Sequence, residues 1–213
     1  MLFQAPERYA AICLSETRVD PTSAHTATIT RNADLWGYTA IWSVPDPSDR
    51  AAGCSIFLRK DLFQSYAILH NQCRIQILQL RTMGGTQICL INHYGKATQD
   101  SASIRGHFTT ISALLQGHTN PHQLTILGGD HNADHRTNSP KGILMADLLD
   151  RADLLDAGLL WNNTVHTFAS RSSPATSRID AVFISANRTN VLKGFSIPGQ
   201  HSLSDHSPVA VDI

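Results

Sequence analysis

Short apolar runs bounded by polar turns recur along this chain, and they constrain its fold more than any other feature. Their length and their content of Ile, Val, Phe and Trp are typical of β-strands. The runs expected to form strands cover residues 10–14, 38–44, 54–58, 75–80, 88–91, 124–127, 179–184 and 209–213. Residues 74–82 and 86–92 predict a β-hairpin, because Gly84 and Gly85 tolerate the positive φ of the turn between them.

Two segments show helical spacing instead. In the first, Asp100 or Ser101 is available as the N-cap and Gly117 is suited to the end of the helix. The apolar residues on one face of this helix are Ile104, Phe108, Ile111 and Leu115. Residues 142–153 repeat the pattern. Many strands and two separated helices predict sheet packed on sheet with helices outside, which is an α/β sandwich.

Composition narrows the class of protein. With 213 residues, 42% hydrophobic and 16% charged, the chain resembles a single globular domain, expected to span residues 1–213. No apolar run approaches the ~20 residues that a membrane helix needs, and the first residues do not resemble a signal peptide. We expect an intracellular protein of the nucleus or cytoplasm, not secreted and not attached to a membrane. The 17 basic and 17 acidic residues give no global attraction to nucleic acid, although a bound cation would supply positive charge locally.

Polar clusters that carry carboxylates stand at the ends of the predicted strands. The strand at 10–14 leads into Glu16, and the strand at 124–127 leads through two glycines to Asp130 and Asn132. Residues two apart in an extended chain point to the same side, so Asp130 and Asn132 are expected to face one site. Each cluster alone is also typical of an ordinary solvated turn.

Two further clusters flank the last predicted strands. Arg178 and Asp180 stand at the start of the strand at 179–184, while Asp205 and His206 stand just before the final strand. Together with the earlier clusters, they offer carboxylate, amide and imidazole groups from remote parts of one small domain. Hard oxygen ligands of this kind suit Mg²⁺ or Mn²⁺, and the cysteines show no CxxC spacing of a zinc site. His131 and His135 are four residues apart, but the polar loop between them is not expected to be helical, so they are not expected to be ligands.

These clusters resemble, in order and content, the signatures of the endonuclease/exonuclease/phosphatase family. The family motifs Gln-Glu-Thr, Gly-Asp-Phe-Asn, Arg-Ile-Asp and Ser-Asp-His followed by Pro-Val are matched by Ser15-Glu16-Thr17, Gly129-Asp130-His131-Asn132, Arg178-Ile179-Asp180 and Ser204-Asp205-His206-Ser207-Pro208-Val209. The match spans residues 10–213. The resemblance implies a four-layer α/β sandwich, in which two packed, mainly antiparallel sheets are flanked by helices.

The resemblance also implies metal-binding and catalytic roles. Glu16 would bind the metal ion, Mg²⁺ or Mn²⁺, and Asp205 would serve a second metal position. Asp130 would position or deprotonate the attacking water. Asp180 would orient the imidazole of His206 and favour its cationic form beside the phosphate.

Substrate contacts are implied for a second group of residues. Asn132 would donate hydrogen bonds to a phosphate oxygen. Tyr94, or its neighbour His93, lies where the family places a Tyr or His that contacts the phosphate, although the usual Tyr-x-Pro is replaced by Tyr94-Gly95-Lys96. Arg178, at the end of a Ser-rich loop, is expected to contact the substrate backbone.

One family motif has no counterpart here. Family members normally open with a strand that reads roughly Trp-Asn-x-Asn, whose Asn helps to hold the metal and phosphate. Fifteen residues precede Glu16, and none of them forms such a motif. The chain is therefore expected to be an N-terminally truncated copy that lacks the first strand, with weakened activity, because losing a central strand exposes backbone groups and removes apolar burial.

The substrate expected from the resemblance is DNA. The segments Ser177-Arg178-Ile179-Asp180 and Gly129 to Ala133 resemble the endonucleases of non-LTR retrotransposon polyproteins, and apurinic-site endonucleases follow closely. The chain would then belong to a longer polyprotein with reverse transcriptase, and no obligatory protein partner is evident. Two other classes stay open. One is a phosphatase or phospholipid phosphodiesterase of the same family, and the other is an inactive remnant or binding domain.

Overall fold

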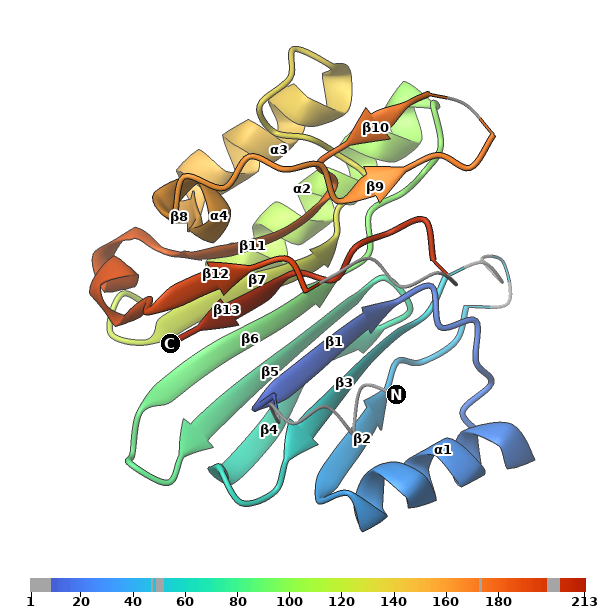
Figure 1. Ribbon diagram of the computed structural model, residues 1–213, viewed down its shortest axis with the longest axis vertical. Coiled ribbons are helices and arrows are strands. Elements are labelled where there is room, and N and C mark those ends of the chain that lie inside the picture. The colour runs from blue at the N-terminus through green and yellow to red at the C-terminus, as the bar shows by residue number, and fades with distance from the viewer. Residues whose placement is uncertain (1–8, 47, 49–51, 173, 199–203) are drawn as a thin grey trace. The chain divides into compact units, whose positions relative to one another are not determined.

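The structure is a computed structural model that describes residues 9–46, 48, 52–172, 174–198 and 204–213 (Figure 1). The chain divides into two compact units, Met1–Tyr94 and Gly95–Ile213. Among the described residues, no helix is both long and apolar enough to cross a membrane.

The first unit contains one helix and two antiparallel sheets. Its elements are β1 (Ala11–Ser15), α1 (Ala24–Leu35), β2 (Tyr38–Trp42), β3 (Cys54–Arg59), β4 (Phe63–Gln72), β5 (Ile75–Thr82) and β6 (Gln87–His93). One sheet has the order β1-β3-β2, and within this unit the strands β4, β5 and β6 pair in sequence order. The predicted hairpin is present as β5 and β6.

The two sheets of the first unit pack face to face. Ile12 and Phe57 point to the face covered by α1, where they form a cluster with Ala33 and Tyr38. The opposite face of β1-β3-β2 meets β5 and β6, and there the Gln76 side chain donates to the carbonyl oxygen of Ile41 at 3.1 Å. This packing ties the end of β1, which carries Glu16, to the inner strands of the unit.

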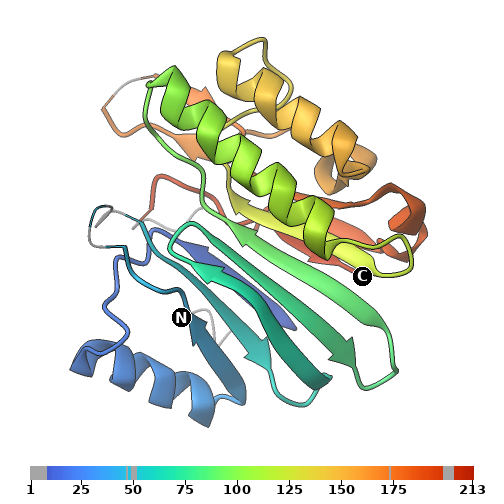
Figure 2. The ribbon, with the colours of Figure 1, turned by 180° about the vertical axis from the view of Figure 1, so that it is seen from behind.

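The second unit combines helices with short strands. Its elements are α2 (Ser101–His118), β7 (Leu124–Asp130), α3 (Pro140–Arg151), β8 (Leu154–Asp156), α4 (Ala157–Leu160), β9 (Phe168–Ala169), β10 (Thr176–Ser177), β11 (Asp180–Ser185), the 3-10 helix η2 (Ala186–Val191), β12 (Gly194–Ser196) and β13 (Ala210–Asp212). Strand β11 lies between β7 and β8 and is antiparallel to both. Helices α2 and α3 lie side by side (Figure 2).

Both predicted helices are present. Helix α2 begins after Asp100, whose side chain accepts from the backbone N–H groups of Ala102 and Ser103, and its buried residues are those predicted. Helix α3 begins at Pro140, two residues before the predicted start, because Ser139 caps it by accepting from the N–H of Gly142.

Helix α1 and strand β4 were not predicted from the sequence. Helix α1 buries only Thr26 and Ala33, so it has no apolar stripe that the spacing of residues would reveal. Strand β4 exposes Tyr66, Ile68 and Leu69, so it lacks the alternation of buried and exposed residues that is typical of a half-buried strand.

Candidate active site

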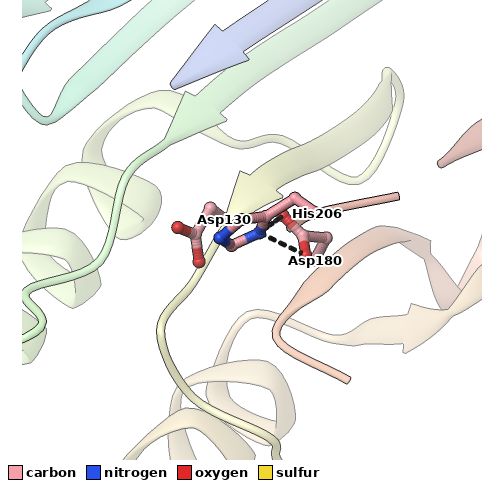
Figure 3. A group of neighbouring side chains, drawn as sticks. All are labelled: Asp130, Asp180 and His206. Atoms are coloured by element: carbon pink, nitrogen blue, oxygen red, sulfur yellow. Dashed lines mark hydrogen bonds and ion pairs between the residues drawn. The ribbon is translucent and has the colours of Figure 1, made fainter. Parts of the chain in front are cut away.

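Three side chains from remote parts of the second unit form a compact cluster (Figure 3). Asp130 ends β7 and Asp180 begins β11, and the two residues are direct cross-strand partners. His206 lies beside β9, where it forms a bridge with Phe168 and its ring lies 5.0 Å from the Phe168 ring. One ligand atom from each of Asp130, Asp180 and His206 lies within 4.8 Å of the other two. Antiparallel pairing thus brings together carboxylates that are 50 residues apart in the sequence.

Asp180 holds the imidazole of His206. The Nδ1 atom of His206 lies 2.9 Å from Oδ2 and 3.1 Å from Oδ1 of Asp180. This hydrogen bond raises the pKa of His206 to about 9, burial opposes the rise, and the charges of Asp180, Asp130 and Asp205 add to it. His206 is therefore cationic at neutral pH, with its Nδ1–H directed at Asp180.

The raised pKa of His206 predicts a pH dependence of stability. A group whose pKa is higher in the folded state contributes stability that is complete below its unfolded value, here 6.5, and is lost as the pH rises through about 9. We expect the free energy of unfolding, measured in urea, to fall between pH 6.5 and pH 9. In His206→Gln this part of the fall should be absent; an unchanged pH profile in that variant would contradict the assignment.

Asn132 positions Asp130. The Asn132 side chain donates to Oδ2 of Asp130 at 3.2 Å and to the carbonyl oxygen of Gly95 at 3.1 Å, and its backbone N–H donates to Oδ1 of Asp130 at 2.9 Å. Asn132 adopts a φ of 49°, in the left-handed region that Asn tolerates better than most residues. In this structure its amide therefore supports Asp130, and a contact with phosphate stays a prediction.

Glu16 lies at the end of β1 in the first unit. The Tyr94 hydroxyl donates to Oε1 of Glu16, and the Arg18 guanidinium donates to Oε2 at 3.2 Å. Glu16 and Arg18 both have positive φ, at 54° and 49°. Gly53 supports this turn, because its carbonyl oxygen accepts from the Thr17 N–H at 3.1 Å and a Cβ there would lie 2.5 Å from Thr17 Oγ1. The turn thus presents a partly exposed carboxylate on a fixed backbone.

Asn92 holds the end of β1, which leads into this turn, and the sequence analysis did not single it out. Its Nδ2 donates to the carbonyl oxygen of Leu14 at 3.0 Å and to that of Ser55 at 3.1 Å. Asn92 and Tyr94 are two residues apart, so both point from the end of β6 toward β1. The spacing of two residues is the sequence signal by which Asn92 could have been predicted to face the same side as Tyr94.

Two residues that were predicted to contact the substrate are buried in this structure. His93 and Arg178 are 0% and 1% exposed. The guanidinium of Arg178 instead binds the carboxylate of Asp156, with Nη2 to Oδ1 at 2.7 Å and a second contact from Nη1 to Oδ2. Arg178 is therefore buried and paired in this structure, and its contact with the substrate stays a prediction.

The remaining predicted site residues divide between the two units. Glu16 and Tyr94 meet in the first unit, whereas Asp130, Asn132, Asp180 and His206 meet in the second. The Asp205 side chain is outside the cluster of three, and its charge contributes to the raised pKa of His206. That Glu16 and Asp205 bind metal, and that Glu16 serves the same site as Asp130, stay predictions.

The donor groups fit a hard divalent cation. Asp130 and Asp180 offer carboxylate oxygens at the shared end of β7 and β11. Within the first unit, Glu16 separately offers a carboxylate that is 45% exposed. Oxygen donors of this kind suit Mg²⁺ or Mn²⁺. Nδ1 of His206 is directed at Asp180, so the imidazole serves best as a cationic hydrogen-bond donor rather than as a ligand.

The fold and the cluster define an α/β protein with a carboxylate and imidazole site at strand ends, and comparison with known proteins places it in a family. A family model described as "Endonuclease-reverse transcriptase" matches residues 88–210, more than half of the chain. The chain belongs to the endonuclease/exonuclease/phosphatase family, whose members are nucleases and phosphodiesterases. No curated protein matches the sequence.

Solved structures match nearly the whole chain at low sequence identity. The endonuclease domain of TRAS1, a telomere-specific non-LTR retrotransposon, is 18% identical, with a TM-score of 0.67 over 96% of this chain and 98% of that one. The 3' phosphatase NExo from Neisseria, bound to product DNA hairpin, is 15% identical, with a TM-score of 0.73 over 98% and 90%. An AP endonuclease from Archaeoglobus fulgidus is 14% identical, with a TM-score of 0.73 over 96% and 89%. The predicted fold class, the α/β sandwich of this family, is therefore confirmed.

Proposed function

We propose that the chain is a Mg²⁺- or Mn²⁺-dependent phosphodiesterase that cuts DNA as an endonuclease, with residues 1–213 acting as one domain. The observation that carries the proposal is the cluster of Asp130, Asp180 and His206, in which a buried carboxylate stands beside an imidazolium held by a second carboxylate. This arrangement pairs a proton acceptor with a cation that stabilises negative charge on a phosphate.

The residues of the cluster divide the chemistry between them. Glu16 would bind a divalent cation, which would neutralise the charge of the scissile phosphate and stabilise the leaving oxygen, and Asp205 would serve a second metal position. Asp130 takes a proton from the attacking water, and the water oxygen bonds to phosphorus as the bond between phosphorus and the sugar oxygen breaks. The leaving sugar oxygen then takes a proton from solvent. Asn132 fixes the Asp130 carboxylate for this step. His206 donates Nε2–H to a phosphate oxygen as negative charge builds up there.

Two comparisons support DNA as the substrate and a retrotransposon endonuclease as the functional class. The NExo structure holds a product DNA hairpin, and the chain matches 98% of the TRAS1 endonuclease domain. The description of the matching family model also supports a place beside reverse transcriptase in a longer polyprotein. Because NExo is described as a 3' phosphatase, a 3'-phosphorylated oligonucleotide is the second substrate to test.

Plasmid nicking tests the proposal. We expect conversion of supercoiled plasmid to the open circle in Mg²⁺ or Mn²⁺, abolished by EDTA and reduced at least 100-fold by Asp130→Ala, because the proton acceptor is lost. Asp147→Ala is the matched control, since Asp147 is exposed on α3 and pairs with Arg151. Inositol phosphates and sphingomyelin should not be hydrolysed.

Each other outcome assigns a different function. Hydrolysis of the lipid or inositol substrates in preference to DNA would reassign the chain to the phosphatase and phospholipase classes. Failure to act on any of these substrates, with Mn²⁺ binding unaltered by Glu16→Gln, would indicate a non-catalytic remnant.

A further inference from the structure

A lysine at the start of α3 is hydrogen-bonded to Lys96, whose neighbour Gly95 is hydrogen-bonded to both Asp130 and Asn132, and no sequence motif marks this lysine. Lys141 is in the first turn of α3, directly after Pro140. A cation in the first turn is unfavourable for the helix, because the helix dipole is positive at that end, and no acidic residue of that turn compensates it. The stability of α3 therefore does not explain the choice of Lys at this position.

Hydrogen bonds link the Lys141 side chain to the segment that carries Asp130. Its Nζ donates to the carbonyl oxygen of Lys96 at 2.8 Å. The preceding residue, Gly95, donates its N–H to the carbonyl oxygen of Asp130 at 2.7 Å, and its carbonyl oxygen accepts from the Asn132 side chain at 3.1 Å. Partial burial lowers the pKa of Lys141, and the negative charge of Asp130 works against that change. The ammonium group is thus partly withdrawn from water within electrostatic reach of the carboxylate that we assign as the proton acceptor.

The backbone next to Lys141 has little freedom. A Cβ at Gly142 would lie 2.5 Å from the carbonyl oxygen of Asp134 and 2.5 Å from that of Thr137. The first turn of α3 therefore presses against the loop that follows Asn132, and the Gly142 N–H is fixed by the Ser139 cap. The start of α3, which carries Lys141, is thus packed against the loop that continues from the Asp130-Asn132 segment.

We propose that Lys141 binds a non-bridging oxygen of the DNA phosphate at the Asp130 site. The inference rests on the proposed function and names a residue for it. An ammonium group has three donors, and the carbonyl oxygen of Lys96 takes one, which leaves donors for phosphate. The carboxylates of Asp130, Asp180 and Asp205 repel a phosphate, and the His206 imidazolium is one cation against these three negative charges. Lys141 would add a second cation that attracts the phosphate.

The alternative is a structural role, in which Lys141 only stabilises the segment around Lys96 through its hydrogen bond to the Lys96 carbonyl oxygen. The two roles differ in what they change. Loss of a phosphate contact weakens DNA binding and lowers the dependence of the affinity on salt concentration. Loss of the hydrogen bond to Lys96 alone changes the stability of the fold without changing that dependence.

The test compares Lys141→Gln with Lys141→Arg and with Arg151→Gln in the full chain. Arg151 is the matched control because it is an exposed cation in the last turn of the same helix, paired with Asp147. The measurements are KM and kcat for plasmid nicking in Mg²⁺, and the affinity for a fluorescent DNA duplex in EDTA at several salt concentrations. Melting temperatures establish that each variant is folded, and Lys141→Met replaces Lys141→Gln if the latter is not.

We expect Lys141→Gln to raise KM and weaken duplex binding about tenfold, the size of one charge-assisted hydrogen bond, with a smaller change in kcat. The slope of log affinity against log salt should fall in magnitude by about one. Lys141→Arg should retain most of the affinity, and Arg151→Gln should behave as the parent chain.

The outcomes separate this inference from the proposed function. If the parent chain nicks DNA in an EDTA-sensitive way but Lys141→Gln matches Arg151→Gln in KM and salt slope, the role of Lys141 is overturned and the function stands. If the parent chain neither nicks nor binds DNA, both are overturned.

Discussion

Replacing His206 by Ala should lower kcat for phosphodiester cleavage by about 100-fold to 1,000-fold, with KM nearly unchanged. The imidazolium is a preorganised cation whose interaction with phosphate strengthens as negative charge builds up in the transition state, and losing one such donor has an effect of this size. The measurement is steady-state kinetics on a supercoiled plasmid or an oligonucleotide substrate at pH 7. His166→Ala is the control, because His166 is exposed and lies outside the cluster.

Asp180 should act through His206, and a double-mutant cycle tests this dependence. Asp180→Asn keeps the shape of the side chain but removes the charge that holds the imidazole cationic. We therefore expect Asp180→Asn to lower kcat, and to add little when His206 is already Ala, because residues that act as a unit are not additive. Fully additive effects of the two substitutions on kcat would contradict the coupling.

The site residues that the sequence predicts best are those fixed by strand geometry. Asp130 and Asp180 stand at the ends of apolar strands, and antiparallel pairing of those strands is enough to bring the two carboxylates opposite each other. His206 precedes the last strand, and a single bridge with Phe168 sets its position. The sequence pattern placed each of these residues at a strand end, the family resemblance predicted that they share a site, and the structure supplies the pairing that brings them together.

Residues whose role depends on a remote partner were not predictable. From the sequence, Arg178 was expected to contact the substrate from the end of a loop. Its partner in the structure, Asp156, lies at the N-terminus of α4, a helix that is too short to detect from the spacing of its residues. Lys141 likewise becomes relevant only once the start of α3 is packed on the loop after Asn132. In both cases burial and tertiary contact, rather than residue type, decide what the cation does.

Removing the Arg178 guanidinium is expected to destabilise the fold by about 3–5 kcal/mol. The side chains of Arg178 and Asp156 are 0% and 2% exposed, so Arg178→Met leaves a buried carboxylate without its cation. The measurement is the free energy of unfolding in urea. Arg171→Met is the matched control, because Arg171 is exposed in the preceding loop and should change stability by less than about 0.5 kcal/mol.

A second substitution distinguishes an unpaired charge from a simple loss of packing. Asp156 also caps α4, since its Oδ1 accepts from the backbone N–H groups of Gly158 and Leu159. Asp156→Asn in the Arg178→Met background keeps an oxygen for this cap and removes the buried charge, so we expect it to restore a large part of the lost stability. Further destabilisation by Asp156→Asn in that background would contradict this explanation. Arg178 lies two residues before Asp180, so the ion pair of Arg178 with Asp156 also holds the start of β11 in place, where the Asp180 carboxylate binds His206.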